Sequence, residues 1–209
     1  MKKFSFFTIT FLMIFFMNKS MAQSSTQATS QGVAKNNQNN NSPNSTKPNA
    51  NLENLLYIDL TYGRVIIEMM PNIAPKHVER IKTLTRQKFY DGIVFHRVID
   101  GFMAQTGDPT GTGMGGSKLP DIKAEFSDEP HIRGAVSMAR ASDPNSANSQ
   151  FFIVTHDSRF LDGQYTVWGR VISGMEFVDK IKKGASRDGK VVGPDGMVKV
   201  RVASDANKM

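Results

Sequence analysis

The sequence contains no cysteine among its 209 residues, and this absence excludes several kinds of chemistry. A chain without thiols has no disulfide framework, no thiolate nucleophile and no lipidated N-terminal cysteine. It also has no run of five or six like charges, and its 26 basic and 19 acidic residues are scattered. Scattered charge of this kind argues against nucleic acid as a partner.

The residues that hold metals, nucleotides or acyl groups are missing or wrongly placed. There is no G-x-S-x-G motif of a serine hydrolase. The G-x-G-x-x-G letters of Gly111 to Gly116 lead into Ser117 to Pro120, a predicted loop, whereas a dinucleotide fingerprint leads into a helix. The four histidines show no metal-ligand spacing: His77, His96, His131 and His156. We therefore expect no cofactor and no metal, and we interpret His96 as a structural histidine whose hydrogen bonds are satisfied.

No apolar run reaches the roughly twenty residues that a membrane-spanning helix needs. The longest, Phe4 to Met17, has fourteen residues and follows Lys2 and Lys3. Ser20 to Ala22 supplies small residues at the spacing that signal peptidase reads, so we predict a signal peptide over residues 1–22. An uncleaved membrane anchor is the alternative. Cleavage would leave an exported chain with no stable membrane insertion.

Residues 23–52 consist almost entirely of Asn, Gln, Ser, Thr, Ala, Lys and Pro. Such a segment cannot bury enough apolar surface to offset its ordering entropy, so we predict a disordered tether. Residues 53–205 are then long enough for one domain with a sizeable core, and we expect a monomer. In a two-membrane bacterium the exported chain would be periplasmic, with secretion or surface association left open.

Short apolar runs separated by turn residues predict a mainly β domain. Leu55 to Thr61 and Arg64 to Met69 predict two strands joined by a tight turn at Tyr62-Gly63. Further strands are predicted over residues 137–138, 151–155, 165–172 and 197–202. The acidic residues between Asp121 and Glu129, Glu125 included, are interpreted as a solvated loop.

Two helices are predicted among these strands. Apolar residues recur at helical spacing from Pro75 to about Lys88, with proline in the first turn. Ser173 and Glu176 have the spacing of a capping box and predict a second, shorter helix that Gly184 ends. Many strands and two helices without βαβ alternation favour an antiparallel barrel or sandwich.

The stretch from Val94 to Asp108 (VFHRVIDGFMAQTGD) organises the domain. It predicts two apolar strands around a turn at Asp100-Gly101, and each strand carries one polar residue, Arg97 or Gln105. Residues 137–155 (SMARASDPNSANSQFFIVT) predict two more buried strands around a polar loop. Apolar strands with a few placed hydrogen-bonding groups are typical of a binding groove.

These two blocks resemble the cyclophilins, a family of peptidyl-prolyl cis-trans isomerases. The resemblance covers about residues 54–203 and rests on FHRVI, GFM-Q-GD, SMARA and SQFFI. It implies a closed eight-stranded antiparallel β-barrel capped by two α-helices. It also implies isomerisation of X-Pro bonds, so the expected partners are proline-containing polypeptide clients, here exported ones.

The resemblance also assigns site residues. Arg97 and Gln105 match catalytic positions. The proline pocket and the peptide groove are matched by Phe102, Met103, Gly113, Ala139, Arg140, Ala141, Gln150, Phe152, Phe160, Leu161 and Tyr165. Three of these depart from residues that are common in the family. Arg140 stands where many members have asparagine, Phe160 where eukaryotic members often have tryptophan, and Tyr165 where they often have histidine.

The chemistry needs no nucleophile. Rotation about an X-Pro bond breaks amide resonance, and the proline nitrogen gains a lone pair as it becomes pyramidal. A donor such as Arg97 aimed at that nitrogen would bind the transition state better than either ground state. A two-residue hairpin loop would set Arg97 opposite Ala104, and a three-residue loop would set it opposite Gln105. We favour the three-residue loop, because it places both polar side chains in one groove and lets Gln105 orient Arg97.

Two other functions stay open on the sequence. A cyclophilin-like binding module would hold proline segments without turning them over. A surface protein presented to a host would use the long tether, and its location would separate it from the first two.

Overall fold

The computed structural model describes residues 52–206. The predicted signal peptide, and the predicted tether as far as residue 51, lie outside these residues. Across residues 52–206, no helix combines the length and the apolar character needed to cross a membrane.

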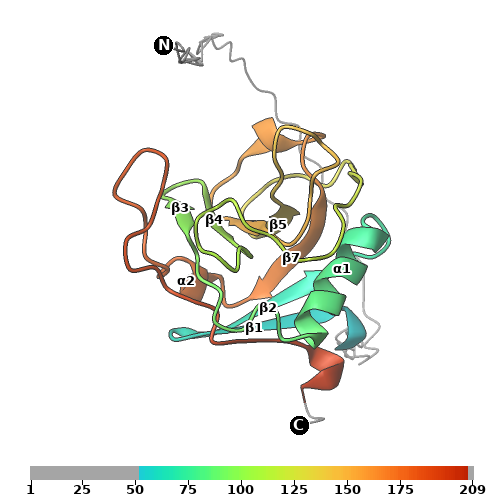
Figure 1. Ribbon diagram of the computed structural model, residues 1–209, viewed down its shortest axis with the longest axis horizontal. Coiled ribbons are helices and arrows are strands. Elements are labelled where there is room, and N and C mark those ends of the chain that lie inside the picture. Colours follow the sequence, from blue (N-terminus) through green and yellow to red (C-terminus); the bar gives the residue numbers. More distant parts are fainter. Residues whose placement is uncertain (1–51, 207–209) are drawn as a thin grey trace, which may run out of the picture. The chain divides into compact units, whose positions relative to one another are not determined.

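Eight strands form one antiparallel sheet with the order β3-β4-β6-β5-β7-β2-β1-β8 (Figure 1). The strands are β1 (Leu55–Leu60), β2 (Gly63–Met69), β3 (Arg97–Ile99), β4 (Met103–Thr106), β5 (Ala135–Met138), β6 (Phe151–Val154), β7 (Val167–Ser173) and β8 (Lys199–Val202). The helices are α1 (Pro75–Arg86) and α2 (Met175–Val178), with 3-10 turns η1 (Leu52–Asn54), η2 (Arg159–Leu161) and η3 (Ala203–Asp205). The prediction of a mainly β domain with two helices is confirmed.

The sheet is a curled half-barrel, and the predicted closure into a full barrel is not seen. Strands β3 and β8 remain at the two ends of the sheet. Between the chain around β3 and the segment before β8, only isolated backbone hydrogen bonds form. The amide of Phe95 donates to the carbonyl of Asp195 (2.8 Å), and the amide of Val191 donates to that of His96 (3.1 Å). Pro194 lies in this segment and has no backbone N–H, so a continuous ladder cannot form there.

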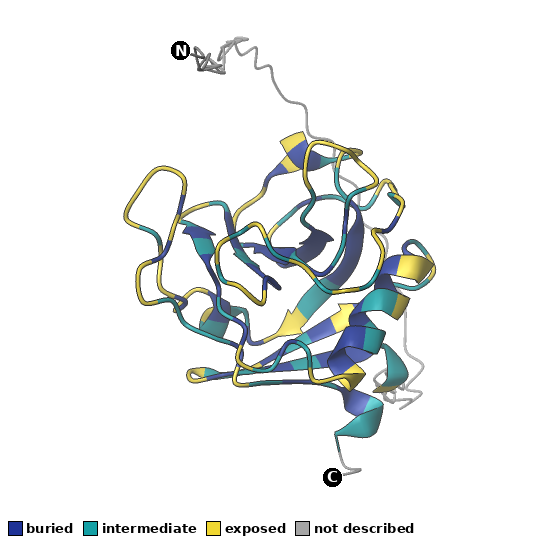
Figure 2. Cartoon of the chain, viewed as in Figure 1, coloured by how far each residue is buried: buried dark blue, intermediate teal, exposed yellow. Residues whose placement is uncertain are grey.

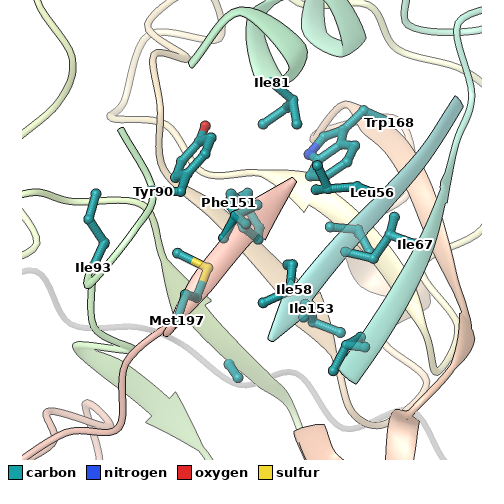
Figure 3. Close-up of a cluster of buried hydrophobic side chains, with 14 of the residues drawn as sticks. Leu56, Ile58, Ile67, Ile81, Tyr90, Ile93, Phe151, Ile153, Trp168 and Met197 are labelled. Atoms are coloured by element: carbon teal, nitrogen blue, oxygen red, sulfur yellow. The ribbon is translucent and has the colours of Figure 1, made fainter. Parts of the chain in front are cut away.

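The inside of the half-barrel is filled by one large apolar cluster (Figure 3). Phe151 lies at its centre, with edge-to-face contacts to Tyr90 (5.6 Å between ring centroids) and Trp168 (5.5 Å). Helix α1 adds Ile81 to this core and leaves its other side to solvent (Figure 2). Burial of aromatic and branched side chains here is the main source of stability for the domain.

Alternation along β4 and β6 separates this core from a second apolar cluster on the other face of the sheet. Ala104 and Ile153 belong to the large core. Their strand neighbours Met103 and Phe152 belong to the second cluster, because successive strand side chains point to opposite faces. The short strands around residues 97–106 and 151–154 thus serve two clusters at once.

Helix α1 begins at Pro75 as predicted, but its cap comes from a distant loop. Ala74, at the N-cap position, makes no side-chain cap. The carboxylate of Glu125 instead accepts hydrogen bonds from the amides of Lys76 and His77 (both 3.1 Å). A negative group suits the positive end of a helix. The interpretation of Glu125 as part of a solvated loop is therefore wrong.

Two local predictions near Gly174 and Gly63 also need correction. Ser173 does not cap α2, because it is paired with Ile66 in the sheet and Gly174 takes the N-cap position in the left-handed region (φ 85°). Helix α2 is also shorter than predicted and ends at Val178. Gly63 pairs with Leu60, so the hairpin turn lies one residue earlier than predicted.

We predict that Gly174→Ala destabilises the domain by about 3 kcal/mol. Its new Cβ would lie 2.3 Å from the carbonyl oxygen of Arg64 and 2.9 Å from the Cα of Val65, and the positive φ adds strain. Gly92→Ala is the matched control, since Gly92 has a similar φ (80°) and no atom within 4 Å of a new Cβ. That control should cost only about 1 kcal/mol. Urea unfolding measures both, and equal losses would contradict the packing argument.

Candidate active site

The β3–β4 hairpin has the three-residue loop that the sequence analysis favoured. Residues 100–102 form the loop, with Gly101 in the left-handed region (φ 68°). The register pairs Arg97 directly with Gln105. Facing residues of an antiparallel pair lie on the same side of the sheet, so both polar side chains reach one surface.

A chain of hydrogen bonds runs from Arg97 across this surface. The Nε of Arg97 donates to the carbonyl of Asp188 (2.8 Å), and its Nη1 donates to Oε1 of Gln105 (3.2 Å). The Nε2 of Gln105 donates to Oε1 of Gln150 (2.9 Å). Gln150 in turn donates to the carbonyls of Gly113 (3.1 Å) and Gly115 (2.8 Å). The guanidinium is thus held at two points while most of its five N–H groups stay available to a ligand.

The glycine-rich loop that receives these bonds is organised by Asp108. Its carboxylate accepts hydrogen bonds from the amides of Thr110 (2.7 Å), Gly113 (2.6 Å) and Gly115 (3.1 Å), and from the hydroxyl of Thr110 (2.8 Å). Burial raises the pKa of Asp108, but the hydrogen bonds from Thr110, Gly115 and Gly113 outweigh it and lower the pKa to about 2. A Cβ at Gly115 would lie 2.2 Å from Oδ1 of Asp108, so glycine is required there.

The loop forms one wall of a polar groove of about 460 Å³. The segment after β5 also lines the groove, and two of its backbone amides donate hydrogen bonds. The amide of Ala139 donates to the carbonyl of Gln150 (3.0 Å), and the amide of Ala141 donates to Oγ of Ser146 (2.9 Å). Six of the predicted site residues line this groove: Gln105, Gly113, Ala139, Arg140, Ala141 and Gln150.

Arg97 reaches the groove through its hydrogen bond to Gln105. The other predicted residues form or border the second apolar cluster, which adjoins the groove through Ala139 and β4. Met103, Phe152 and Leu161 are among its buried members, and Phe102, Ala139 and Tyr165 pack against it. The ring of Tyr165 meets Phe152 edge to face (5.8 Å). Phe160 is 66% exposed, and its ring centroid lies 5.5 Å from that of Phe102. Each predicted site residue therefore contacts at least one other predicted site residue.

His131 is a site-supporting residue that the sequence reasoning missed. Its ring stacks at 20° on that of Phe152, with the centroids 6.3 Å apart. Its Nδ1 lies 3.0 Å from Oδ1 of Asp162, and its Nε2 lies 3.0 Å from Oγ of Ser137. Burial lowers the pKa of His131, and the Asp162 carboxylate offsets this only in part. No spacing signal marks a histidine that supports a neighbouring ring, so the sequence offered no way to find it.

The prediction for His96 was half right. The side chain is buried, as expected of a structural histidine, but within residues 52–206 neither ring nitrogen has a hydrogen-bond partner. It packs behind the glycine-rich loop, with Nε2 3.6 Å from where a Cβ of Gly113 would stand. Burial lowers the pKa of His96. No cluster of three His, Cys, Asp or Glu side chains that could hold a metal occurs in the described part of the chain.

We predict that Asp108→Asn lowers the free energy of unfolding by on the order of 2 kcal/mol at pH 7. The folded pKa of Asp108 is about 2, below the ordinary value near 4, so its stabilisation is present above pH 4 and is lost as the pH falls toward 2. The difference between wild type and variant should therefore shrink over that range in urea unfolding curves. Asp128→Asn changes an exposed carboxylate and should show little difference at any pH. A constant gap for Asp108→Asn would contradict the titration argument.

Comparison with known proteins identifies the family of this chain. Residues 55–202 match the family described as "Cyclophilin type peptidyl-prolyl cis-trans isomerase/CLD". A "Probable peptidyl-prolyl cis-trans isomerase" of Brucella suis is 51% identical over 172 residues, which cover 77% of this chain and 88% of that protein.

Solved structures agree as well. A cyclophilin from Hirschia baltica is 32% identical with a TM-score of 0.67, over 75% of this chain and 76% of that one. A cyclophilin-type isomerase of Cryptosporidium parvum, solved in the presence of the dipeptide Ala-Pro, is 29% identical with a TM-score of 0.65, over 71% and 98% of the two chains. The half-barrel, the paired Arg97 and Gln105, and these matches together show that the chain belongs to the cyclophilin family and is a cyclophilin-type peptidyl-prolyl cis-trans isomerase.

Proposed function

We propose that the polar groove and the second apolar cluster hold an X-Pro segment, and that Arg97 stabilises the twisted amide. The observation that carries this proposal is the position of the Arg97 guanidinium. It is fixed by the carbonyl of Asp188 and by Oε1 of Gln105, and the strand of Gln105 also carries Met103 of the apolar cluster. A proline ring on that cluster would bring its nitrogen toward the free N–H groups of Arg97.

The mechanism requires only a change in charge distribution. Rotation about the X-Pro bond must cross a barrier of about 18–20 kcal/mol, because the C–N bond has partial double-bond character. At the twisted geometry the nitrogen lone pair becomes a hydrogen-bond acceptor. An arginine N–H then binds the transition state more strongly than the planar cis or trans amide, which is the condition for catalysis.

The apolar cluster must supply a large part of the effect. Uncatalysed isomerisation takes about 10–100 s, so a turnover in about a millisecond requires roughly 6–7 kcal/mol. One charge-assisted hydrogen bond contributes about 1.5–3 kcal/mol. Grip on the proline ring by Phe102, Met103 and Phe152, and exclusion of water from the amide, account for the remainder in this proposal.

Gln105 has two tasks in this scheme. Its Oε1 accepts from Arg97 and fixes the guanidinium. Its Nε2 has two hydrogens, and only one is used in the bond to Gln150. The second hydrogen is available to the carbonyl oxygen on the X side of the X-Pro bond. The Cryptosporidium parvum isomerase was solved in the presence of the dipeptide Ala-Pro, which supports an X-Pro segment as the ligand in this proposal.

We expect Arg97→Ala to lose at least about two decades in kcat/KM for an X-Pro peptide, the loss of roughly 2.7 kcal/mol that one transition-state donor supplies. Two-dimensional exchange NMR measures the cis–trans rate without an auxiliary protease. Arg64→Ala is the matched control, because Arg64 pairs with Asp59 in the β1–β2 hairpin and should leave the rate unchanged.

Three outcomes of that comparison are informative. Equal activity of wild type and Arg97→Ala would mean that another residue is the transition-state donor. A wild type that binds proline peptides without accelerating exchange would favour the binding-module alternative. Loss in Arg97→Ala but not in Arg64→Ala supports the proposed mechanism.

We further propose that the chain is exported and assists the folding of exported polypeptides. The support is the sequence of residues 1–22, with Lys2 and Lys3 before a fourteen-residue apolar run. A protein without cysteine also folds without an oxidant, which suits a compartment outside the cytosol.

Export predicts a defined product. When the full chain is expressed in a two-membrane bacterium, we expect the periplasmic fraction to contain a form that starts at Gln23. Intact-mass analysis of the fractions measures this. A full-length form retained in the membrane fraction would favour the uncleaved anchor, and a shortened form in the medium would favour secretion.

A further inference from the structure

The side chain of Arg140 is held at the edge of the groove by neutral acceptors. Its Nε and Nη2 donate to the carbonyl of Gln164 (3.3 and 3.0 Å), and its Nη1 donates to the carbonyls of Ala141 (2.9 Å) and Ser142 (3.3 Å). The guanidinium carbon lies 4.6 Å from the ring centroid of Tyr165, within the range of a cation–π contact. Four of its five N–H groups are thereby used, and the guanidinium is fixed before any ligand arrives.

No carboxylate in the described part of the chain pairs with this guanidinium. Among residues 52–206, Arg140 forms no ion pair, whereas Arg64, Arg86, Arg133, Arg159, Arg170 and Arg201 each do. Arg97 forms none within the same residues either, and its two partners are a carbonyl and an amide. The two guanidinium groups of the site thus have no carboxylate partner among the described residues, and the same holds for Arg80 and Arg187. The paired Arg159 adjoins the site residue Phe160, but its charge is matched by Asp162.

The described acidic groups near the groove accept hydrogen bonds from amide donors, and none of them pairs with Arg140. The carboxylate of Asp108 keeps its charge, but its oxygens accept hydrogen bonds from the amides and hydroxyl of the glycine-rich loop. Asp143, three residues after Arg140, accepts a hydrogen bond from the amide of Asn145 (2.8 Å). Asp121 lines the same groove as Arg140, and Nδ2 of Asn148 donates to its Oδ1 (2.9 Å). The groove thus carries a cation on the side of Arg140 and one carboxylate at Asp121.

We propose that Arg140 is a specificity-determining residue that favours substrates with a carboxylate side chain within two residues of the proline. This rests on the proposed use of the groove for X-Pro segments. The remaining N–H of Arg140 donates to the carboxylate, and the fixed guanidinium supplies the complementary charge at little cost in ordering. A lysine or a neutral side chain at the same substrate position gains neither contribution.

The test uses blocked peptides with one central proline and either Glu or Gln at each of the positions up to two residues before or after it. Exchange NMR gives kcat/KM for each pair with the full-length protein. We expect a Glu-to-Gln ratio of about two to five at one or more positions, since a partly exposed ion pair is worth up to about a factor of five. The ratio should fall toward one when the salt concentration is raised from about 0.02 M to about 0.5 M.

Variants at position 140 separate charge from structure. Arg140→Gln should bring the ratio to about one, and Arg140→Lys should retain part of it. Arg140→Glu should invert it. Because the ratio is internal to each variant, a general loss of activity cancels. Arg133→Gln is the matched control, since Arg133 is exposed and paired with Asp179, and its ratio should equal that of wild type.

The outcomes distinguish the role of Arg140 from the proposed isomerase function on which it rests. A wild-type ratio of one at every position, or an unchanged ratio in Arg140→Gln, overturns the role of Arg140 while leaving the isomerase groove intact. Failure of the wild type to accelerate any of the peptides overturns the proposed function and this inference with it.

Discussion

The pairing of Arg97 with Gln105 across the β3–β4 hairpin is the constraint on which the site depends. A hairpin of three-residue and four-residue strands fixes its register through its turn, and a slip of one residue would send every side chain to the opposite face. The three-residue loop, with Gly101 in the left-handed region, prevents that slip. Arg97 then faces Gln105, and Gln105 connects through Gln150 to the glycine-rich loop.

The alternation of side chains along each strand explains how one sheet holds both a core and a site. In β4 and β6, one set of side chains fills the half-barrel while the other forms the apolar cluster outside it. The outward-facing set is backed by the close-packed core, which supports it as a platform beside the groove. A rigid platform suits a reaction that needs no covalent step, because positioning and charge are the protein's only contributions.

Charge around the groove is handled in two ways. Asp108 is buried, and its carboxylate accepts hydrogen bonds from backbone amides, which sets the shape of the glycine-rich wall. Arg97 and Arg140 are fixed by carbonyl and amide oxygens instead of carboxylates, so their orientation is set while their charge is kept. An ion pair would have fixed them equally well but would have cancelled the field that a ligand experiences.

Much of this protein was determined by local sequence. The helix from Pro75 and most of the strands follow from spacing and turn chemistry, which act between near neighbours. The three-residue hairpin loop was favoured because it places Arg97 and Gln105 in one groove, and the observed register confirms it. The motif around Arg97 and Gln105, through its resemblance to a family, indicated the class of enzyme.

Tertiary structure decided what depends on residues far apart in the chain. Glu125 caps α1 from almost fifty residues away, and His131 supports Phe152 from another loop, so neither role leaves a mark in local spacing. Ser173 lost its predicted capping role because pairing with β2 competed for the same residue. The sheet is a half-barrel because the segment that would close it contains a proline and makes isolated loop hydrogen bonds instead of a continuous ladder. Long-range pairing and packing decide such outcomes, and a pattern in the sequence records only the preferences that they override.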